Sequence, residues 1–427
     1  MSASLKQLLF NHDATDKRGS ALNLRIDYDE AIVGPEWSRT SVRLPIELPI
    51  AYAARHIDPG ALGIFANFSW NGLPPQRLEI QAVPAQPRLS DADPRTALLR
   101  SLADSWAPIN PTLSRYYASL AELAADAPPI LGRIPPTPVT IGADGESGAV
   151  FLKLNGGRLR ASAVGIHEIA WRWQYRTATS PRWQDFDTSF HRIFTTLDLP
   201  ATPWLQEPAE VWNSALPWSG ALELACSWAS GARLKRDVAA MICAGVHAMG
   251  YGQIEYGCPV GAREMYTNTP MGIFDLTAFL ERARGGLGNG PYVNCTDCAC
   301  AVSTFANLLG ADLWQGRMGQ YVPAFMLRDS QTIGHSSWGS PCNLGLGFMF
   351  HEVGWSGDCE QDDAIYDASV VVDSNLSPFA HLPVPLLPAG IPFGSIWQTF
   401  YRRMLAAPES LLICHPLPEE RRRRALI

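Results

Sequence analysis

The stretch that decides the fold reads Tyr292-Val-Asn-Cys295-Thr-Asp-Cys-Ala-Cys-Ala-Val-Ser-Thr-Phe-Ala-Asn-Leu-Leu-Gly310. From Ala299 onward its apolar residues recur at helical spacing, and Gly310 is a typical residue to end a helix. We therefore expect Cys295 at the beginning of a buried helix. Backbone N–H groups without helical partners and the helix dipole favour a thiolate at that position. The pattern predicts a nucleophilic cysteine.

A base and an orienting acid for this nucleophile follow in two strand-like runs. His351 lies in the run 347–355, and Asp367 lies 16 residues later in the run 363–373. Because only a short turn separates the runs, we expect two antiparallel strands that place the imidazole beside the carboxylate. The carboxylate would then orient the imidazole, and the imidazole would activate Cys295.

This segment resembles the core of the transglutaminase-like superfamily, within the papain-like cysteine fold. Members of that superfamily begin a helix with Cys-x-Asp-x-Ala and end it at a glycine. Here Cys295, Asp297 and Ala299 match this start, and Gly310 follows Cys295 by 15 residues. The resemblance covers 292–373 well and 220–427 weakly.

The resemblance implies that Cys295 is the nucleophile, His351 the base and Asp367 the orienting acid. The order Cys, His, Asp also fits arylamine N-acetyltransferases and peptide N-glycanases, which share this core. The sequence departs from these families at two points. Glu352 stands where an aromatic residue often follows the histidine, and the Arg-Gly-Gly approach to the cysteine of the acetyltransferases is absent.

The activity implied by the resemblance is acyl transfer at an amide bond, of the peptidase, amidase, deamidase or transglutaminase type. It implies a protein or peptide substrate and needs neither a cofactor nor a metal ion. Two alternatives stay open. One is a binding module that keeps the fold without catalysis. The other is a zinc-stabilised structural protein in which Cys295, Cys298 and Cys300 bind the metal together with Cys359 or His351.

The site residues have alternatives as well. Cys298 and Cys300 occupy other faces of the same helix and are rival nucleophiles. His335 is a rival base, and Asp363 and Asp373 are rival acids. We expect Cys298 and Cys300 to be core thiols and His335 to lie in a loop, and neither Asp363 nor Asp373 fits the expected spacing as well as Asp367.

Cysteine usage divides the chain in two. The first 225 residues contain none, whereas all nine lie between Cys226 and Cys414. Alternating runs in the first half predict strands, with Asn71-Gly72 as a hairpin turn. Helical spacing marks an insert at about 93–126 and segments of the second half. The predicted strands are 22–28, 41–50, 63–70, 77–83, 149–154, 165–176 and 190–197, and the predicted helices of the second half include 220–230, 235–249 and 275–284.

These elements predict an α+β protein with two domains. Residues 1–200 would form a β-sandwich-like accessory domain that carries the helical insert. Prolines at positions 200, 203 and 208 mark the boundary. Residues 211–427 would form the transglutaminase-like, papain-like catalytic domain.

Composition and charge limit the kinds of partner that we expect for this protein. The 427 residues include 34 Lys and Arg against 41 Asp and Glu, a net charge of −7, which argues against a nucleic-acid partner. We expect the arginines at 421–424 to form a solvated tail. No apolar run reaches about 18 residues, so no membrane span is expected. Without a recognisable signal peptide, the expected location is the cytoplasm, where cysteines are thiols, with export by a route that cleaves no signal as the alternative.

Overall fold

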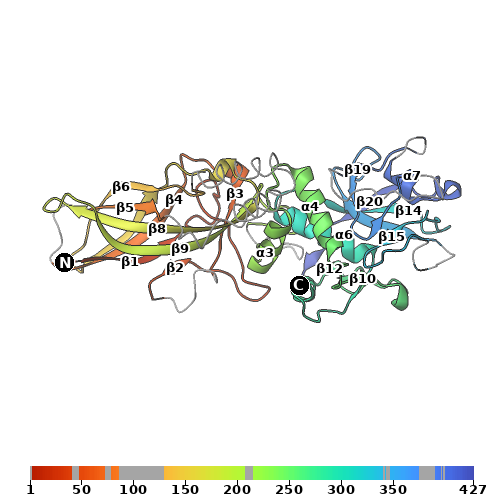
Figure 1. Cartoon of the computed structure of the whole chain (residues 1–427), viewed down its shortest axis with the longest axis horizontal. Helices are drawn as coiled ribbons and strands as arrows, with labels where there is room; N and C mark the ends of the chain where they lie inside the picture. Colours follow the sequence, from red (N-terminus) through yellow and green to blue (C-terminus); the bar gives the residue numbers. More distant parts are fainter. Residues whose placement is uncertain are drawn as a thin grey trace, which may run out of the picture. The chain divides into compact units, whose positions relative to one another are not determined.

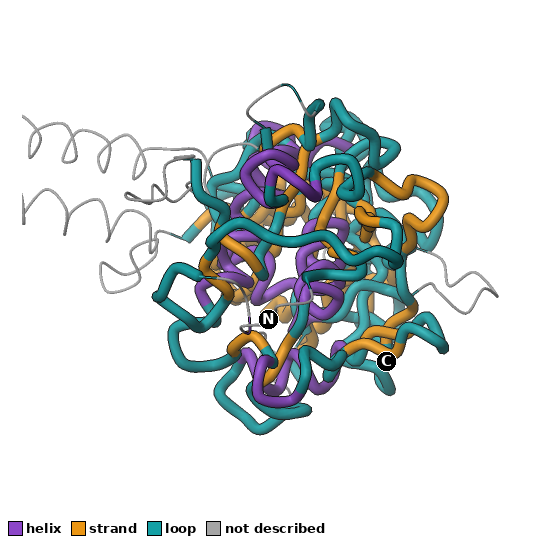
Figure 2. Tube along the Cα trace, turned by 90° about the vertical axis from the view of Figure 1, so that its right-hand side faces the viewer, coloured by secondary structure: helices purple, strands orange, loops and turns teal. Residues whose placement is uncertain are grey.

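The computed structural model describes residues 2–40, 48–72, 78–85, 129–206, 215–339, 342, 347–374, 390–395, 397 and 400–427. Both helices and strands occur among them, which confirms the expected α+β class (Figure 2). The helical insert predicted at about 93–126 lies outside the described residues. The chain divides into two compact units. The first comprises Met1–Leu22, Ile32–Ser162 and Ile166–Thr195, and the second comprises Asn23–Ala31, Ala163–Gly165 and Thr196–Ile427.

The first unit contains two sheets (Figure 1). One has the order β2-β1-β4-β7, and the other has the order β3-β9-β8-β5-β6. Apolar side chains of both sheets share one buried core, in which Leu5 and Ile64 from the first sheet join Ile80 and Trp173 from the second. The strands are β1 (Ser2–Leu9), β2 (Trp37–Ser38), β3 (Ile50–Ala53), β4 (Gly63–Asn71), β5 (Leu78–Pro84), β6 (Ile134–Val139), β7 (Glu146–Lys153), β8 (Gly165–Thr177) and β9 (Gln184–Thr196).

Two expectations for this half are wrong. The run 22–28 forms no strand, because Asp27 Oδ1 accepts hydrogen bonds from the backbone N–H groups of Asp29 and Glu30 and folds the segment into a turn. Asn71-Gly72 does not close a hairpin. β4 pairs with β1 and β7, whereas β5 pairs with β6 and β8, so this turn joins strands of different sheets. Most of the predicted strand 41–50 lies outside the described residues.

The second unit packs helices against a sheet (Figure 1). Apolar spacing predicts α3 (Ser219–Trp228), α4 (Lys235–Ala248) and α5 (Leu276–Ala283), and the structure confirms all three to within two residues. The central helix α6 (Cys295–Leu308) is buried along its whole length and contacts α3, α4 and the sheet. A short helix, α7 (Tyr401–Leu405), follows near the C-terminus.

The main sheet of this unit has the order β19-β17-β16-β14-β20. Its strands are β14 (Trp314–Gly319), β16 (Phe350–Trp355), β17 (Ala364–Tyr366), β19 (Ile391–Pro392) and β20 (Pro416–Arg422). Three smaller pairings surround it. They are β10 (Glu255–Tyr256) with β13 (Tyr292–Val293), β11 (Thr267–Asn268) with β12 (Ile273–Phe274) and β21 (Ala425–Leu426), and β15 (Gln331–Thr332) with β18 (Val370–Val371).

The arginines near the C-terminus do not form the solvated tail that the sequence suggested. Arg422 ends β20, and Arg424 is only 1% exposed because it forms an ion pair with the buried carboxylate of Glu352. Arg423 lies over the ring of Trp314, with 3.9 Å between the guanidinium carbon and the ring centroid. Of these four arginines, Arg424 places its charge in the interior of the second unit, whereas Arg421 and Arg423 pair with the exposed carboxylates of Asp358 and Asp312.

Candidate active site

The first turn of α6 is capped from both sides. The Asn294 side chain accepts a hydrogen bond from the backbone N–H of Asp297 at 3.0 Å, and the Asp297 carboxylate accepts one from the backbone N–H of Asn294 at 3.2 Å. This reciprocal capping box satisfies two donors that a helix otherwise leaves unpaired. It starts the helix at Cys295, where the sequence pattern placed it.

Asp297 also ties a distant segment to this helix start. Its carboxylate accepts hydrogen bonds from the backbone N–H groups of Met265 and Tyr266, both at 3.0 Å. Burial raises the pKa of Asp297 to about 6, although hydrogen bonds from Met265 and other groups oppose this shift. Asp297 therefore has a structural role, because it holds residues 265–266 against the helix turn that begins with Cys295.

The structure brings His351 and Asp367 together. The antiparallel pairing of β16 and β17 aligns Gly354 with Tyr366, and Asp367 directly follows β17. His351 Nε2 lies 2.8 Å from Asp367 Oδ2, within hydrogen-bonding distance. Both side chains are buried, so water does not compete for this contact.

The Asp367 carboxylate is fully engaged. Its Oδ1 atom accepts hydrogen bonds from the backbone N–H groups of Ser369 and Val370 and from the Ser369 hydroxyl. Its Oδ2 atom accepts a hydrogen bond from the hydroxyl of Tyr401 at 2.6 Å, in addition to the contact with His351. Burial alone would raise the pKa of Asp367, but His351, Tyr401 and Ser369 outweigh it and lower the pKa. The carboxylate is therefore held as an anion in one orientation.

His351 interacts with Cys295 as well as with Asp367. Nε2 makes the contact with Asp367, and Nδ1 makes no hydrogen bond within the part of the chain that the structure describes. Burial alone would lower the pKa of His351. The charge and hydrogen bond of Asp367, together with the hydrogen bond and charge of Cys295, outweigh it and raise the pKa to about 10. At neutral pH the ring is therefore a cation beside the Cys295 sulfur.

Two tyrosines belong to this site that the sequence did not reveal. Tyr401 orients Asp367, as described above. Tyr256, at the end of β10, hydrogen-bonds to Cys295. Burial and the negative charges of Cys295 and Cys298 raise the pKa of Tyr256 well above its usual range, so its hydroxyl keeps its proton and can donate. Neither tyrosine lies in a motif, and only the fold brings them to the cysteine.

A disulfide bond includes Cys258, two residues after Tyr256. Cys258 and Cys342, whose Cα atoms are 4.9 Å apart, are bonded to each other. This corrects the expectation that every cysteine is a free thiol. The ring of Tyr256 stacks on that of Phe348, whose ring in turn lies 5.6 Å from that of His351. The disulfide thus joins the segment that follows Tyr256 to the one that precedes Phe348.

The rival nucleophiles are poor candidates. Burial raises the pKa of Cys298 well above that of an ordinary thiol and raises the pKa of Cys300 to about 12. The same cause raises the thiol pKa of Cys226, Cys243, Cys359 and Cys414.

The rival base and acids lie elsewhere. His335 is exposed in a turn, where its backbone N–H bonds to Thr332. The carboxylate of Asp363 accepts hydrogen bonds from the backbone N–H groups of Asp358 and Glu360 and closes the turn between β16 and β17. Asp373 is buried, but it is Asp367 that contacts His351.

Within the described ranges, no group of three or more His, Cys, Asp or Glu side chains is arranged to bind a metal ion. The zinc alternative therefore finds no support in this part of the chain. Of the helices described, none has the length and apolar character needed to cross a membrane.

Comparison with protein-family models and with curated proteins finds no match to this chain.

Proposed function

We propose that this protein is a cysteine-dependent acyl-transfer enzyme that acts on an amide bond, with Cys295 as nucleophile, His351 as general acid and base, and Asp367 as orienting acid. One observation carries the proposal. His351 is hydrogen-bonded through Nε2 to the Asp367 carboxylate, and it also interacts with Cys295, which begins a buried helix. Nucleophile, base and orienting group in this order are the parts that acyl transfer needs.

The proposed reaction begins with the Cys295 thiolate attacking the amide carbonyl carbon. The carbonyl π electrons move to oxygen, and the resulting oxyanion meets donors at the helix start. Asn294 already caps the N–H of Asp297, so the backbone N–H groups of Cys295 and Thr296 are the available donors of the first turn. The Tyr256 hydroxyl, which keeps its proton, is a further donor.

Collapse of this intermediate breaks the C–N bond. The cationic His351 gives its proton to the departing amine and leaves a thioester on Cys295. Neutral His351 then takes a proton from water or from an acceptor amine as that molecule attacks the thioester. The C–S bond breaks and Cys295 leaves as a thiolate beside the protonated His351. Attack by water yields a carboxylic acid, and attack by an amine yields a new amide. Hydrolysis, deamidation and crosslinking share every step up to the thioester.

The fold assignment within this proposal is a transglutaminase-like core in the second unit and a β-sandwich-like accessory domain in the first. A helix that starts at the cysteine and packs on an antiparallel sheet with histidine and aspartate on adjoining segments supports the first part. Two sheets around one core support the second. We propose that the accessory domain helps to select a protein or peptide substrate. The Cys258–Cys342 disulfide favours an oxidising compartment over the cytoplasm expected from sequence.

Alkylation by iodoacetamide, followed by mass spectrometry of each cysteine, tests this proposal without a known substrate. Cys295 should react faster at pH 6–7 than the six other free cysteines, and His351→Ala should slow it by about 100-fold because the thiolate loses its cation. Equal reaction of Cys295 and the buried thiols in the folded wild type would contradict the proposed mechanism and favour a binding module.

A second measurement tests the thioester. With dimethylcasein as the amide source and hydroxylamine as the acceptor, the wild-type protein should form hydroxamate, and Cys295→Ala should not. Cys295→Ser is the matched variant, because it keeps a hydroxyl of similar size but a far weaker nucleophile. Hydroxamate formation that survives Cys295→Ala would rule out Cys295 as the nucleophile.

A further inference from the structure

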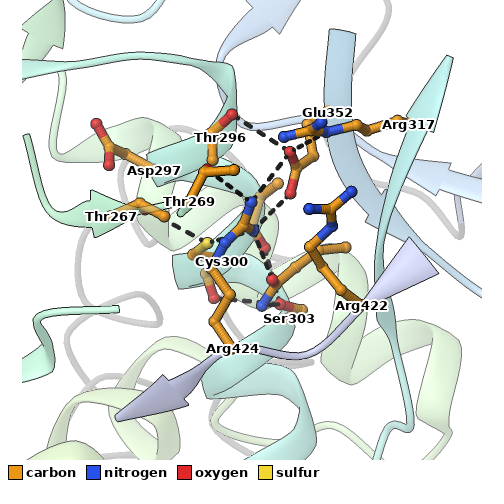
Figure 3. A network of polar contacts seen from close by, with 12 residues as sticks. Thr267, Thr269, Thr296, Asp297, Cys300, Ser303, Arg317, Glu352, Arg422 and Arg424 are labelled. Carbon is orange, nitrogen blue, oxygen red and sulfur yellow. Dashed lines mark hydrogen bonds and ion pairs between the residues drawn. The ribbon is translucent and has the colours of Figure 1, made fainter. Parts of the chain in front are cut away.

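The residue after the proposed base is a buried carboxylate at the centre of a polar network. Glu352 has no exposed surface, and its Oε2 atom accepts a hydrogen bond from Arg317 Nε at 2.7 Å. Its Oε1 atom accepts one from Arg424 Nη1 at 2.5 Å. The hydroxyl of Thr296, on α6, donates a third at 3.3 Å (Figure 3). Glu352 stands where the sequence departs from the transglutaminase-like pattern.

The Thr296 contact links two chain segments at the position next to the proposed chemistry. Thr296 directly follows Cys295, and Glu352 directly follows His351. The hydrogen bond between their side chains therefore joins the first turn of α6 to the start of β16. The contact therefore lies one residue along the chain from each of the two proposed catalytic side chains, Cys295 and His351.

Both arginines are themselves anchored. Arg424 Nη1 also donates to Gln315 Oε1 at 2.7 Å and to Cys300 Sγ at 3.1 Å. Arg317 Nη1 donates to the Tyr321 hydroxyl at 2.7 Å. Burial alone would raise the pKa of Glu352, but the charges and hydrogen bonds of the two arginines outweigh it and lower the pKa. The carboxylate is thus an anion that cannot move without leaving a buried cation unpaired.

Stability alone is a weak reason to keep such a cluster, since apolar residues of similar volume often replace a buried ion pair without loss. We propose that Glu352, held by Arg317 and Arg424, is a positioning residue that acts through Thr296 to set the separation of Cys295 and His351. This inference rests on the proposed function. It also gives the C-terminal segment that carries Arg424 a part in the site, although Arg424 touches neither proposed catalytic residue.

The test removes the link without disturbing the ion pairs. Thr296→Val deletes the hydroxyl and keeps the side-chain shape, and Thr296→Ser restores a hydroxyl. Thr304→Val is the matched control. Thr304 is buried in the same helix, and its hydroxyl has no hydrogen-bond partner within the described residues. The readouts are the rate of Cys295 alkylation by iodoacetamide from pH 5 to pH 10 and the melting temperature.

We expect Thr296→Val to slow alkylation at pH 6 by about 3- to 10-fold, the range that one hydrogen bond spans, and to move the pH profile toward that of an ordinary thiol. Thr296→Ser should restore at least half of the rate, and Thr304→Val should match the wild type. Glu352→Gln, which keeps an acceptor oxygen but loses the charge, should slow alkylation further. Adding Thr296→Val to it should then have little extra effect.

The outcomes separate the two proposals. If wild-type Cys295 reacts no faster than the other thiols, the proposed function fails. If it reacts preferentially but Thr296→Val leaves its rate and pH profile unchanged, only the positioning role is overturned. A loss in Thr296→Val that Thr296→Ser does not restore assigns the effect to packing and also overturns that role. Because these threonine variants leave both ion pairs in place, the result does not depend on whether Glu352→Gln folds.

Discussion

The Tyr401 hydroxyl donates a hydrogen bond to Asp367 Oδ2 at 2.6 Å, and this is the oxygen that His351 Nε2 approaches at 2.8 Å. This one carboxylate oxygen thus contacts both the phenol hydroxyl of Tyr401, on α7, and the imidazole of His351, on β16. Tyr401 is 2% exposed, so this hydrogen bond forms away from bulk water. The short helix α7 therefore helps to determine the charge and orientation of the acid behind the proposed base.

Tyr401→Phe should weaken that support. Losing a buried hydrogen bond to a charged group costs about 1.5–3 kcal/mol of stability. The pKa of Asp367 should rise because one stabilising donor is gone, and Cys295 alkylation should slow by roughly 3- to 10-fold. Thermal unfolding and iodoacetamide kinetics measure the two effects. Tyr251→Phe, at a residue that is 90% exposed, is the matched control and should change neither. Unchanged alkylation in folded Tyr401→Phe would show that this hydrogen bond has no part in the site.

The charged pair of His351 and Asp367 predicts a specific pH dependence of stability. The pKa of His351 rises from its ordinary value of about 6.5 to about 10 in the folded protein. Protonation of His351 therefore stabilises the fold fully below about pH 6.5 and progressively less as the pH rises through 10. Asp367, whose pKa is lowered, contributes above its ordinary pKa and stops contributing as the pH falls through its folded value. The pair should be strongest between these limits.

Thermal unfolding of wild type and His351→Gln checks this dependence. The wild type should melt above the variant at pH 6–7, and the difference should shrink by roughly 3 to 10 °C by pH 10, at about 2–4 °C per kcal/mol for a unit of this size. Comparing the two proteins at the same pH removes the contribution of other titrating groups. A difference that is the same at pH 7 and pH 10 would mean that His351 is not held as a cation.

Reduction of the Cys258–Cys342 disulfide should destabilise the second unit. The bond joins residues 84 positions apart, and closing a loop of that order stabilises a fold by about 2–5 kcal/mol. The melting temperature should fall when a phosphine reductant is added, and Cys295 alkylation should slow because the segment beside Tyr256 loosens. The double variant Cys258→Ser, Cys342→Ser should melt at the lower temperature with or without reductant. A wild-type melting temperature that does not change when the reductant is added would show that this disulfide is absent or does not stabilise the unit.

Asp297→Asn should destabilise the helix start. The two carboxylate oxygens of Asp297 accept hydrogen bonds from the backbone N–H groups of Met265, Tyr266 and Asn294. An asparagine side chain has only one acceptor oxygen and leaves at least one of these donors unpaired. An unpaired buried donor costs about 1–3 kcal/mol. Unfolding in urea, with an unchanged slope, measures the loss. Asp237→Asn in the first turn of α4, where the side chain is exposed, is the control and should cost under about 0.5 kcal/mol. If Asp297→Asn and Asp237→Asn lose the same free energy of unfolding, Asp297 has no special role in stabilising the helix start.

Several parts of the fold follow from local sequence. Apolar spacing places α3, α4 and α5, because a helix buries one face whatever its neighbours are. The start of α6 follows from Asn294 and Asp297, whose capping contacts lie within four consecutive residues. The strands β4, β5, β7 and β8 follow from alternation.

Strand pairing does not follow from the local pattern. Asn71-Gly72 has the composition of a hairpin turn, yet β4 and β5 belong to different sheets. Alternation shows that one face of a strand is buried but does not name the strand beside it. Likewise, four successive arginines have the composition of a solvated tail, and only the buried carboxylate of Glu352 gives Arg424 a reason to enter the interior.

Local pattern was thus enough to expect Cys295 at a helix start and His351 beside Asp367, because a helix start and two neighbouring strands each have a short-range signature. The tertiary structure alone brought Tyr256 to Cys295, Tyr401 to Asp367 and Glu352 to Thr296. These contacts join residues that lie 34 to 56 positions apart in the sequence. Each contact forms because leaving a buried polar group without a hydrogen-bond partner is costly. Such a cost depends on what surrounds a side chain after folding, and no short run of sequence records it.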